Sequence, residues 1–404
     1  MPIDTGSTAF MLTSAALVLF MTPGLAFFYG GLEDRKSVLT MMMQSFISMA
    51  WVGILWFVAG YSLTFGGFGN NGVVGDLSKV FLIGVKPSDI WLQTGVPEYV
   101  IFVYQMMFAI ITPALITGAF AKRVRFPAWI MILTAWHFLI YVPFAHMIWG
   151  GGWLAQWGVL DFAGGISVHN TAGFASIAAV VFLGKRKRVI EEPHNIPFIA
   201  LGVGMLWFGW FGFNAGSELK VDEVTALAFV NTMLGAIFGG AAWAIMDRIF
   251  KGHMTFIGML VGFVAGLATV TATAGFIPAW SASIVGIVAG VGCYLAIMLK
   301  NKIGFDDALD VWGCHGMGGF YGIFMLGIFA TKAVNGAGAD GLITGHVDFF
   351  LKECAVIALS SIWSFVVTYA ILFVVNLISK VRPDAEAEEN IDEALIHEMA
   401  YEAA

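Results

Sequence analysis

Charged residues are scarce in this sequence of 404 residues. Asp, Glu, Lys and Arg make up 12% of the chain, whereas 59% is hydrophobic and the mean hydropathy is +0.84. Soluble globular domains are typically about one quarter charged, so the composition excludes that class and indicates a polytopic membrane protein in a lipid bilayer. Of the net charge of −7, residues 380–404 contribute −6. The nearly neutral body offers no basic surface for nucleic acid.

Cysteine is rare as well. The three cysteines, Cys293, Cys314 and Cys354, all fall inside hydrophobic stretches. Their spacing matches neither a zinc motif nor a disulfide framework, and the sequence has no H-E-x-x-H motif of a zinc hydrolase. We therefore expect no metal, no cofactor and no enzymatic activity.

Hydrophobic stretches long enough to cross a bilayer, at about 20 residues each, occur eleven times. The first lacks a basic segment and a cleavage site, so we expect it to be retained rather than removed as a signal peptide. The predicted fold is all-α, with a membrane domain over 1–379 and an acidic cytoplasmic tail over 380–404. The stretches are 8–31, 38–65, 99–120, 128–147, 162–184, 196–217, 223–246, 255–273, 279–298, 308–330 and 353–379.

Lysine and arginine are divided unevenly between the two sides of this arrangement. With the N-terminus outside, 15 of the 20 basic residues fall on the inner side. Cytoplasmic loops collect basic residues, so we predict a cell-membrane protein with its N-terminus outside and its C-terminus in the cytoplasm. The inner residues are Arg35, Lys36, Lys122, Arg123, Arg125, the run from Lys185 to Arg188, Arg248, Lys251, Lys300, Lys302, Lys380 and Arg382.

The pattern D-x7-H-x3-G-F occurs twice, once with Asp161 and His169 and once with Asp307 and His315. The predicted topology gives these two helices opposite directions, which indicates two inverted five-helix repeats plus an extra C-terminal helix. Each histidine lies about 12 Å from its own helix start, so both should reach one depth and face each other. A lone histidine could simply bond a neighbouring helix, but a matched pair favours function.

Asp161 lies at the outer start of the fifth stretch. An aspartate there can accept hydrogen bonds from the free amides of the helix and complement its dipole. We therefore interpret Asp161 as supporting the site rather than binding a ligand.

Aromatic residues from three stretches should gather at the outer end. Interface anchoring explains many Trp and Tyr residues, but not two phenylalanines one turn deeper beside a hydroxyl. Aromatic faces with one hydroxyl would hold a small cation, and the phenyl rings would block water. The residues are Tyr104 and Phe108, Trp149, and Trp210, Phe213 and Ser217.

A passage in which two imidazoles are the titratable groups favours one kind of cargo. An alkali ion would exchange its water for almost no oxygen ligands. Ammonium can instead release a proton and cross as ammonia. Imidazole is the side chain that titrates near neutrality, so the histidine pair could carry the proton separately.

Several motifs resemble those of the ammonium transporters of the Amt/Mep/Rh group. The segment DFAGGISVHNTAGFASIAAVVFLGKR, which contains His169, is similar to the family signature position by position. The resemblance extends over essentially the whole chain. It includes PGLAFFYGG, AHMIWGGG, WFGWFGFNAGS and VWGCHGMGGF.

The resemblance implies a homotrimer with one pore in each subunit. It implies that Tyr104, Trp149 and Ser217 recruit ammonium, that Phe108 and Phe213 form the gate, and that His169 and His315 are the twin histidines, while Asp161 supports the architecture and Trp210 lies beside the pore. In the family, the tail couples subunits and contacts a PII-type signalling protein. Two residues depart from the pattern: Tyr104 replaces the Phe of many bacterial members, and Asn390 replaces a glycine, a change that still permits a left-handed backbone.

Two other functions compete with ammonium transport. An ammonium sensor could use the same fold, although residues 380–404 are too short for a kinase or cyclase domain. A metalloenzyme or haem protein could use His169 and His315 as ligands, but the sequence has no third histidine at the same depth.

Overall fold

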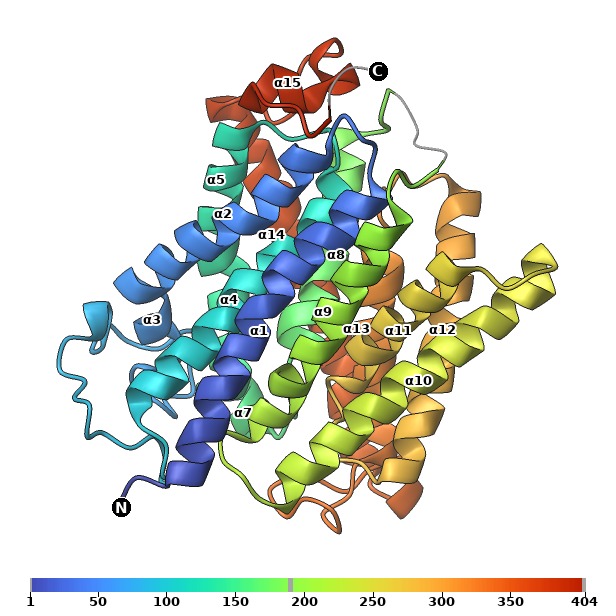
Figure 1. Ribbon diagram of the computed structural model, residues 1–404. Coiled ribbons are helices and arrows are strands. Elements are labelled where there is room, and N and C mark those ends of the chain that lie inside the picture. Colours follow the sequence, from blue (N-terminus) through green and yellow to red (C-terminus); the bar gives the residue numbers. More distant parts are fainter. Residues whose placement is uncertain (1, 188–191, 402–404) are drawn as a thin grey trace.

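The computed structural model describes residues 2–187 and 192–401, which form a bundle of helices without any strand (Figure 1). Arg188, which belongs to the predicted inner basic run, lies outside these residues. Nine helices of the described chain are long and apolar enough to cross a membrane. The predicted all-α polytopic membrane fold is therefore confirmed at this level.

Most of the nine spans match the predicted stretches to within a few residues. Their bounds are α1 Thr5–Leu32; α2 Val38–Leu55 with η1 Trp56–Gly60 and α3 Tyr61–Phe65; α4 Glu98–Phe120; α5 Phe126–Trp136 with η3 His137–Tyr141, α6 Val142–Trp149 and the short α7 Trp153–Trp157; η4 Gly165–Asn170 with α8 Thr171–Leu183; α9 Ile196–Ala215 with η5 Gly216–Glu218; α10 Glu223–Lys251; α12 Ala279–Ile303; and α14 Val347–Ile378.

Two predicted stretches are shorter as helices. The stretch 255–273 contains α11 (Phe256–Val270), and 308–330 is divided between η6 (Trp312–Gly316) and α13 (Met317–Phe329). Brief helices outside the bundle are η2 (Val80–Leu82), η7 (Leu342–Thr344), η8 (Ala387–Glu389) and α15 (Ile391–Ile396).

The wider turns of π-helix occur four times in the bundle, as η1, η3, η4 and η6. Such turns are rare and frequently mark functional sites. His169 lies in η4 and His315 lies in η6, so the two halves of the D-x7-H repeat share this irregularity.

Glycines allow the segments that carry the two histidines to approach closely. A Cβ built on Gly173 of α8 would lie 2.0 Å from the Cα atom of Gly316 in η6. A Cβ on Gly319 of α13 would lie 2.6 Å from the backbone nitrogen of Asn170. No side chain fits in either place, so small residues here bring two backbones together, as is usual where membrane helices pack.

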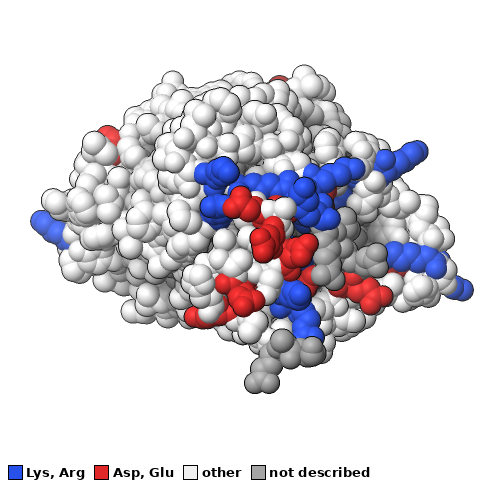
Figure 2. Space-filling view, turned by 90° about the horizontal axis from the view of Figure 1, so that it is seen from above, with Lys and Arg blue, Asp and Glu red and all other residues white. Residues whose placement is uncertain are grey.

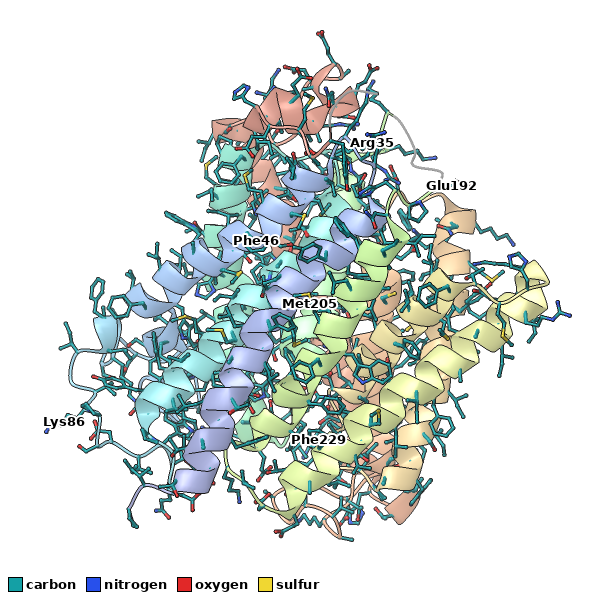
Figure 3. All side chains as sticks on the ribbon, in the orientation of Figure 1. Arg35, Phe46, Lys86, Glu192, Met205 and Phe229 are labelled. Carbon is teal, nitrogen blue, oxygen red and sulfur yellow. The ribbon has the colours of Figure 1, made fainter. Side chains whose placement is uncertain are left out.

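Charged residues gather at one end of the bundle. The two termini lie at opposite ends (Figure 1), and Arg35 and Glu192 lie at the end opposite Lys86 (Figure 3). Figure 2 shows mixed basic and acidic groups on the end that carries α15. Ion pairs at this end join Lys122 to Asp34, Arg186 to Asp306, Arg125 to Asp384 and Arg382 to Glu388.

The C-terminal tail is docked on this charged end. The carboxylate of Asp392 accepts hydrogen bonds from the backbone amides of Leu39 and Thr40, at 2.9 and 2.8 Å, and so caps the N-terminus of α2. Asn390 has φ −143° and ψ 67°. This conformation is outside the left-handed region, so the position does not require the glycine that Asn390 replaces.

Asp306 is the centre of the most buried of these ion pairs. Its carboxylate accepts hydrogen bonds from the guanidinium and the backbone amide of Arg186, and it lies 3.6 Å from the fully buried Arg123. Burial alone would raise the pKa of Asp306, but the hydrogen bonds and charge of Arg186 outweigh burial and hold the pKa below its ordinary value. The ionised carboxylate is therefore the form that stabilises the fold.

Replacing Asp306 by Asn should destabilise the protein, because Arg123 and Arg186 would lose the carboxylate that forms ion pairs with both of them. Removing one partner of a buried pair costs on the order of 3 kcal/mol, which should lower the melting temperature of the detergent-solubilised protein by several degrees at pH 7. Because the folded pKa lies below the ordinary value of 3.8, the difference should be complete above pH 3.8 and should disappear as the pH falls from there through the lower folded pKa. Asp384→Asn is the matched control, since its pair with Arg125 is exposed and such pairs contribute little. Equal melting temperatures for both variants would contradict this assignment.

Candidate functional site

The two histidines of the repeat meet inside the bundle. Nδ1 of His169 lies 3.2 Å from Nδ1 of His315, and the rings are nearly parallel, at 13°, with centroids 5.3 Å apart. Each side chain is almost completely buried. At this distance one Nδ1 can donate a hydrogen bond to the other, and the tautomers decide which one donates.

Trp210 also packs against the ring of His169. Its indole stacks on the imidazole with centroids 5.5 Å apart and an angle of 21°. The indole nitrogen donates a hydrogen bond to the hydroxyl of Thr271 at 2.9 Å, which fixes the ring. Nε2 of His169 is buried and has no partner in the described part of the chain.

Asp161 and Asp307 occupy equivalent places in front of the two π-helical turns. The Asp161 carboxylate accepts the backbone amides of Gly164, Gly165, Ile166 and Ser167 at 2.7 to 3.2 Å. Asp307 accepts the backbone amide of Trp312 at 2.8 Å. Because its oxygens are occupied by these amides, the Asp161 carboxylate orients η4 rather than facing the cavity above it.

A cavity of about 250 Å³, which we name the outer cavity after the predicted orientation, lies at the N-terminal end of the bundle. The structure brings three of the predicted residues, Phe108, Trp149 and Ser217, to its wall. Phe108 packs edge-on against Trp149 with centroids 5.9 Å apart, and the Trp149 indole donates a hydrogen bond to the backbone oxygen of Asp161 at 2.8 Å. Aromatic faces and a hydroxyl oxygen thus meet at one cavity, as cation binding requires.

Tyr104 lies behind this wall. Its ring contacts Phe108 with centroids 5.1 Å apart. Its hydroxyl is buried, 2.9 Å from the backbone oxygen of Phe213 and 3.2 Å from the hydroxyl of Ser217. The Tyr104 hydroxyl therefore fixes the end of α9, and its ring is not among the groups that line the outer cavity.

The floor of the outer cavity is a pair of stacked phenyl rings. Phe108 and Phe213 have centroids 4.1 Å apart and an interplanar angle of 26°. Phe108 lines the outer cavity. Phe213 lines a separate and much smaller chamber, which lies deeper in the bundle. The pair closes the path between them.

The chamber below the phenyl pair has a volume of about 10 Å³, which is close to the least space that holds one water-sized molecule. His169 and His315 both line it, and the other lining groups are carbon surfaces and the Trp210 ring. The remaining lining residues are Met21, Leu25, Ile111, Leu115, Val168, Leu206 and Phe213.

His315 also lines a third cavity, of about 210 Å³, at the opposite end. This inner cavity has a charged rim that includes Arg186, Glu192 and Asp310. Outer cavity, phenyl pair, chamber, histidine pair and inner cavity therefore follow one another through the bundle.

Among the residues of the outer cavity that sequence patterns missed, Gln105 and Trp91 have polar groups without a partner. The amide oxygen of Gln105 and the indole nitrogen of Trp91 are both buried without a partner among the residues that the structure describes. Gln105 could have been found as a polar residue inside an apolar stretch. Trp91 comes from the long loop between α3 and α4, where no periodic pattern exists.

The alternative hypothesis of a metalloenzyme requires a set of metal ligands, and the described ranges, 2–187 and 192–401, contain none. No group of three or more His, Cys, Asp or Glu residues there lies close enough to hold a metal ion. His169 and His315 would supply two nitrogens, which is fewer than the usual three or four protein ligands of zinc.

Comparisons with known proteins identify relatives of the chain. The sequence pattern of the Ammonium Transporter Family matches residues 9–401. The chain is 42% identical to an ammonium transporter of Bacillus subtilis over 99% of both chains, and 39% identical to ammonium transporter Amt1 of Archaeoglobus fulgidus over 99% of this chain and all of that one. The crystal structure of Saccharomyces cerevisiae Mep2 is similar with a TM-score of 0.88 and 33% identity, covering 96% of this chain and 89% of that one.

The family pattern spans nearly the whole chain, and the relatives match it from end to end. The chain therefore belongs to the ammonium transporter family.

Proposed function

We propose that this protein carries ammonium across the cell membrane by separating it into ammonia and a proton. The observation that carries this proposal is the chamber of about 10 Å³ between the stacked phenyl rings and the histidine pair. The chamber has room for one small neutral molecule, and its walls are apolar side chains and two imidazoles. A hydrated cation would have to give up its water there without gaining oxygen ligands.

Recruitment takes place in the outer cavity. The faces of Phe108 and Trp149 attract the ammonium cation, and the hydroxyl oxygen of Ser217 accepts one of its hydrogen bonds. Tyr104 contributes from behind by holding Ser217 and the end of α9 in place. Asp161 supports this site through the backbone oxygen that accepts the Trp149 N–H.

Transfer begins when Phe108 and Phe213 part. The ammonium N–H bond breaks and the proton passes to the imidazole pair, while ammonia occupies the chamber. Nε2 of His169 is suited to accept the proton because it is buried without a partner. The contact between the two Nδ1 atoms links His169 to His315, which lines the inner cavity, where the proton is released and ammonia is protonated again.

The membrane domain, over 1–379, contains eleven crossing segments in two inverted five-helix repeats followed by α14. Two features support this: the π-helical turns that carry His169 and His315 follow equivalent aspartates, and the termini lie at opposite ends, as an odd number of crossings requires (Figure 1). The end with the inner basic residues faces the cytoplasm. The N-terminus is then outside.

The tail, over 380–404, is a cytoplasmic regulatory element, and the protein works as a homotrimer with a pore in each subunit. Membership of the ammonium transporter family supports the trimer and a PII-type signalling protein as the partner of the charged end (Figure 2). The hydrogen bonds of Asp392 to the start of α2 give the tail a direct connection to the membrane domain.

Replacing either His169 or His315 by Ala should remove the proton path. In liposomes given an ammonium jump, the steady current should fall by about 100-fold or more, which is the usual contribution of a positioned proton-transfer group, while potassium gives no current in any variant. His253→Ala, an exposed histidine between α10 and α11, is the control. Unchanged ammonium currents in both pore variants would refute the relay. Binding of ammonium by the wild type without a steady current would indicate a sensor instead.

Tyr104→Phe should weaken recruitment, because it keeps the ring and removes the hydroxyl that bonds to the Ser217 region. A net contribution of about 1 kcal/mol for a buried hydrogen bond predicts a rise of roughly fivefold in the half-saturating ammonium concentration. The maximal current should be nearly unchanged. Tyr99→Phe, which removes an exposed hydroxyl bonded to the backbone of Val85, should leave both values alone. An unaltered half-saturating concentration in Tyr104→Phe would show that the hydroxyl has no part in recruitment.

A further inference from the structure

Glu353 is a buried carboxylic acid in α14, the helix outside the repeat. Its side chain is 0% exposed, no ion pair of the described residues includes it, and its Oε2 atom has no partner among them. Its Oε1 atom accepts a hydrogen bond from the backbone amide of Leu160 at 2.8 Å. A buried carboxyl group with one backbone bond is costly to keep, so its position calls for a function.

The Leu160 amide connects Glu353 to the wall of the outer cavity. Leu160 directly precedes Asp161, whose backbone oxygen accepts the Trp149 N–H at 2.8 Å and whose carboxylate binds the amides at the start of η4. The next residue, Phe162, also lines the outer cavity, and its amide is bound to the backbone oxygen of Ala272 at 3.1 Å. Each of residues 160–162 is therefore fixed by a hydrogen bond of its own, and Glu353 accepts the bond from the first of them.

The part of α14 that carries Glu353 packs closely against α13. A Cβ on Gly327 of α13 would lie 3.0 Å from the ring of Phe350 and 3.4 Å from the Cβ of Glu353. Because α13 and α14 pack this closely, the Glu353 carboxyl group has a rigid base. A rigid acceptor can set the position of the loop that it binds.

We propose that Glu353 is a positioning residue for ammonium recruitment, acting through the Leu160 amide on Asp161 and Trp149. The inference rests on the proposed function of the outer cavity. It gives α14 a part in forming the outer site. What matters is an oxygen acceptor at the reach of a glutamate side chain, and the negative charge is not required.

Three substitutions separate reach from charge. Glu353→Gln keeps an oxygen at the same reach and removes the charge, so the half-saturating ammonium concentration should stay within about twofold of wild type. Glu353→Asp keeps the charge but withdraws the oxygen by one methylene, and Glu353→Leu removes the acceptor. Both should raise the half-saturating concentration, by about tenfold for Leu, since a buried amide is left without a partner.

The experiment is the ammonium dependence of the steady current in liposomes, with potassium as the selectivity control. Maximal current and rejection of potassium should persist in all three variants, because the phenyl rings and the histidine pair are untouched. Thr368→Val is the matched control: it removes another buried acceptor of α14, the partner of the Trp136 indole nitrogen, far along the helix from Glu353. It should leave the half-saturating concentration unchanged.

Several outcomes would overturn the proposal. If Glu353→Asp keeps the wild-type half-saturating concentration while Glu353→Gln raises it as much as Glu353→Leu does, the charge of Glu353 is what matters. If Asp and Leu both keep the wild-type half-saturating concentration, Glu353 does not position the site. If Leu does not fold, the comparison of Asp with Gln decides. Absence of an ammonium current in the wild type would instead count against the proposed function, so the two failures are distinguishable.

Discussion

The close approach of Gly173 and Gly316 is the constraint on which the rest of the site depends. Because neither residue has a side chain, the backbones of α8 and η6 meet, and the imidazoles of His169 and His315 come within hydrogen-bonding distance, 3.2 Å between Nδ1 atoms. A larger residue at either glycine would separate the segments. The histidine pair is thus a consequence of backbone packing, and the aspartates that cap η4 and η6 fix the direction of each turn.

Exclusion of water is what gives the two imidazoles a function in the proposed mechanism. The stacked rings of Phe108 and Phe213 separate the outer cavity from the small chamber, and Trp210 covers one face of His169. Moving a cation from water into such apolar surroundings has a high free-energy cost, whereas moving a small neutral molecule there does not. In the proposed mechanism, the aromatic faces of the outer cavity and the Ser217 hydroxyl bind the cation before it loses its proton.

Much of this arrangement could be predicted from the sequence, because hydropathy locates the helices and the D-x7-H spacing locates the histidines. Other features depend on contacts that a linear pattern does not contain. The π-helical turns reflect how η4 and η6 pack, and Trp91 reaches the outer cavity from a loop without periodicity. Glu353 was passed over because hydropathy started the last stretch at residue 353. The helix begins earlier, at Val347, and this places Glu353 inside it as a buried group.

Passage of a proton along with each ammonia molecule is tested most directly by the ratio of charge to nitrogen. Current and uptake of isotopically labelled ammonium would be recorded on the same batch of liposomes. We expect one elementary charge for each nitrogen taken up, and the same ratio whether or not potassium is present. Nitrogen uptake without net charge would contradict the proton path through His169 and His315, and an equal current in potassium would contradict the closed phenyl pair.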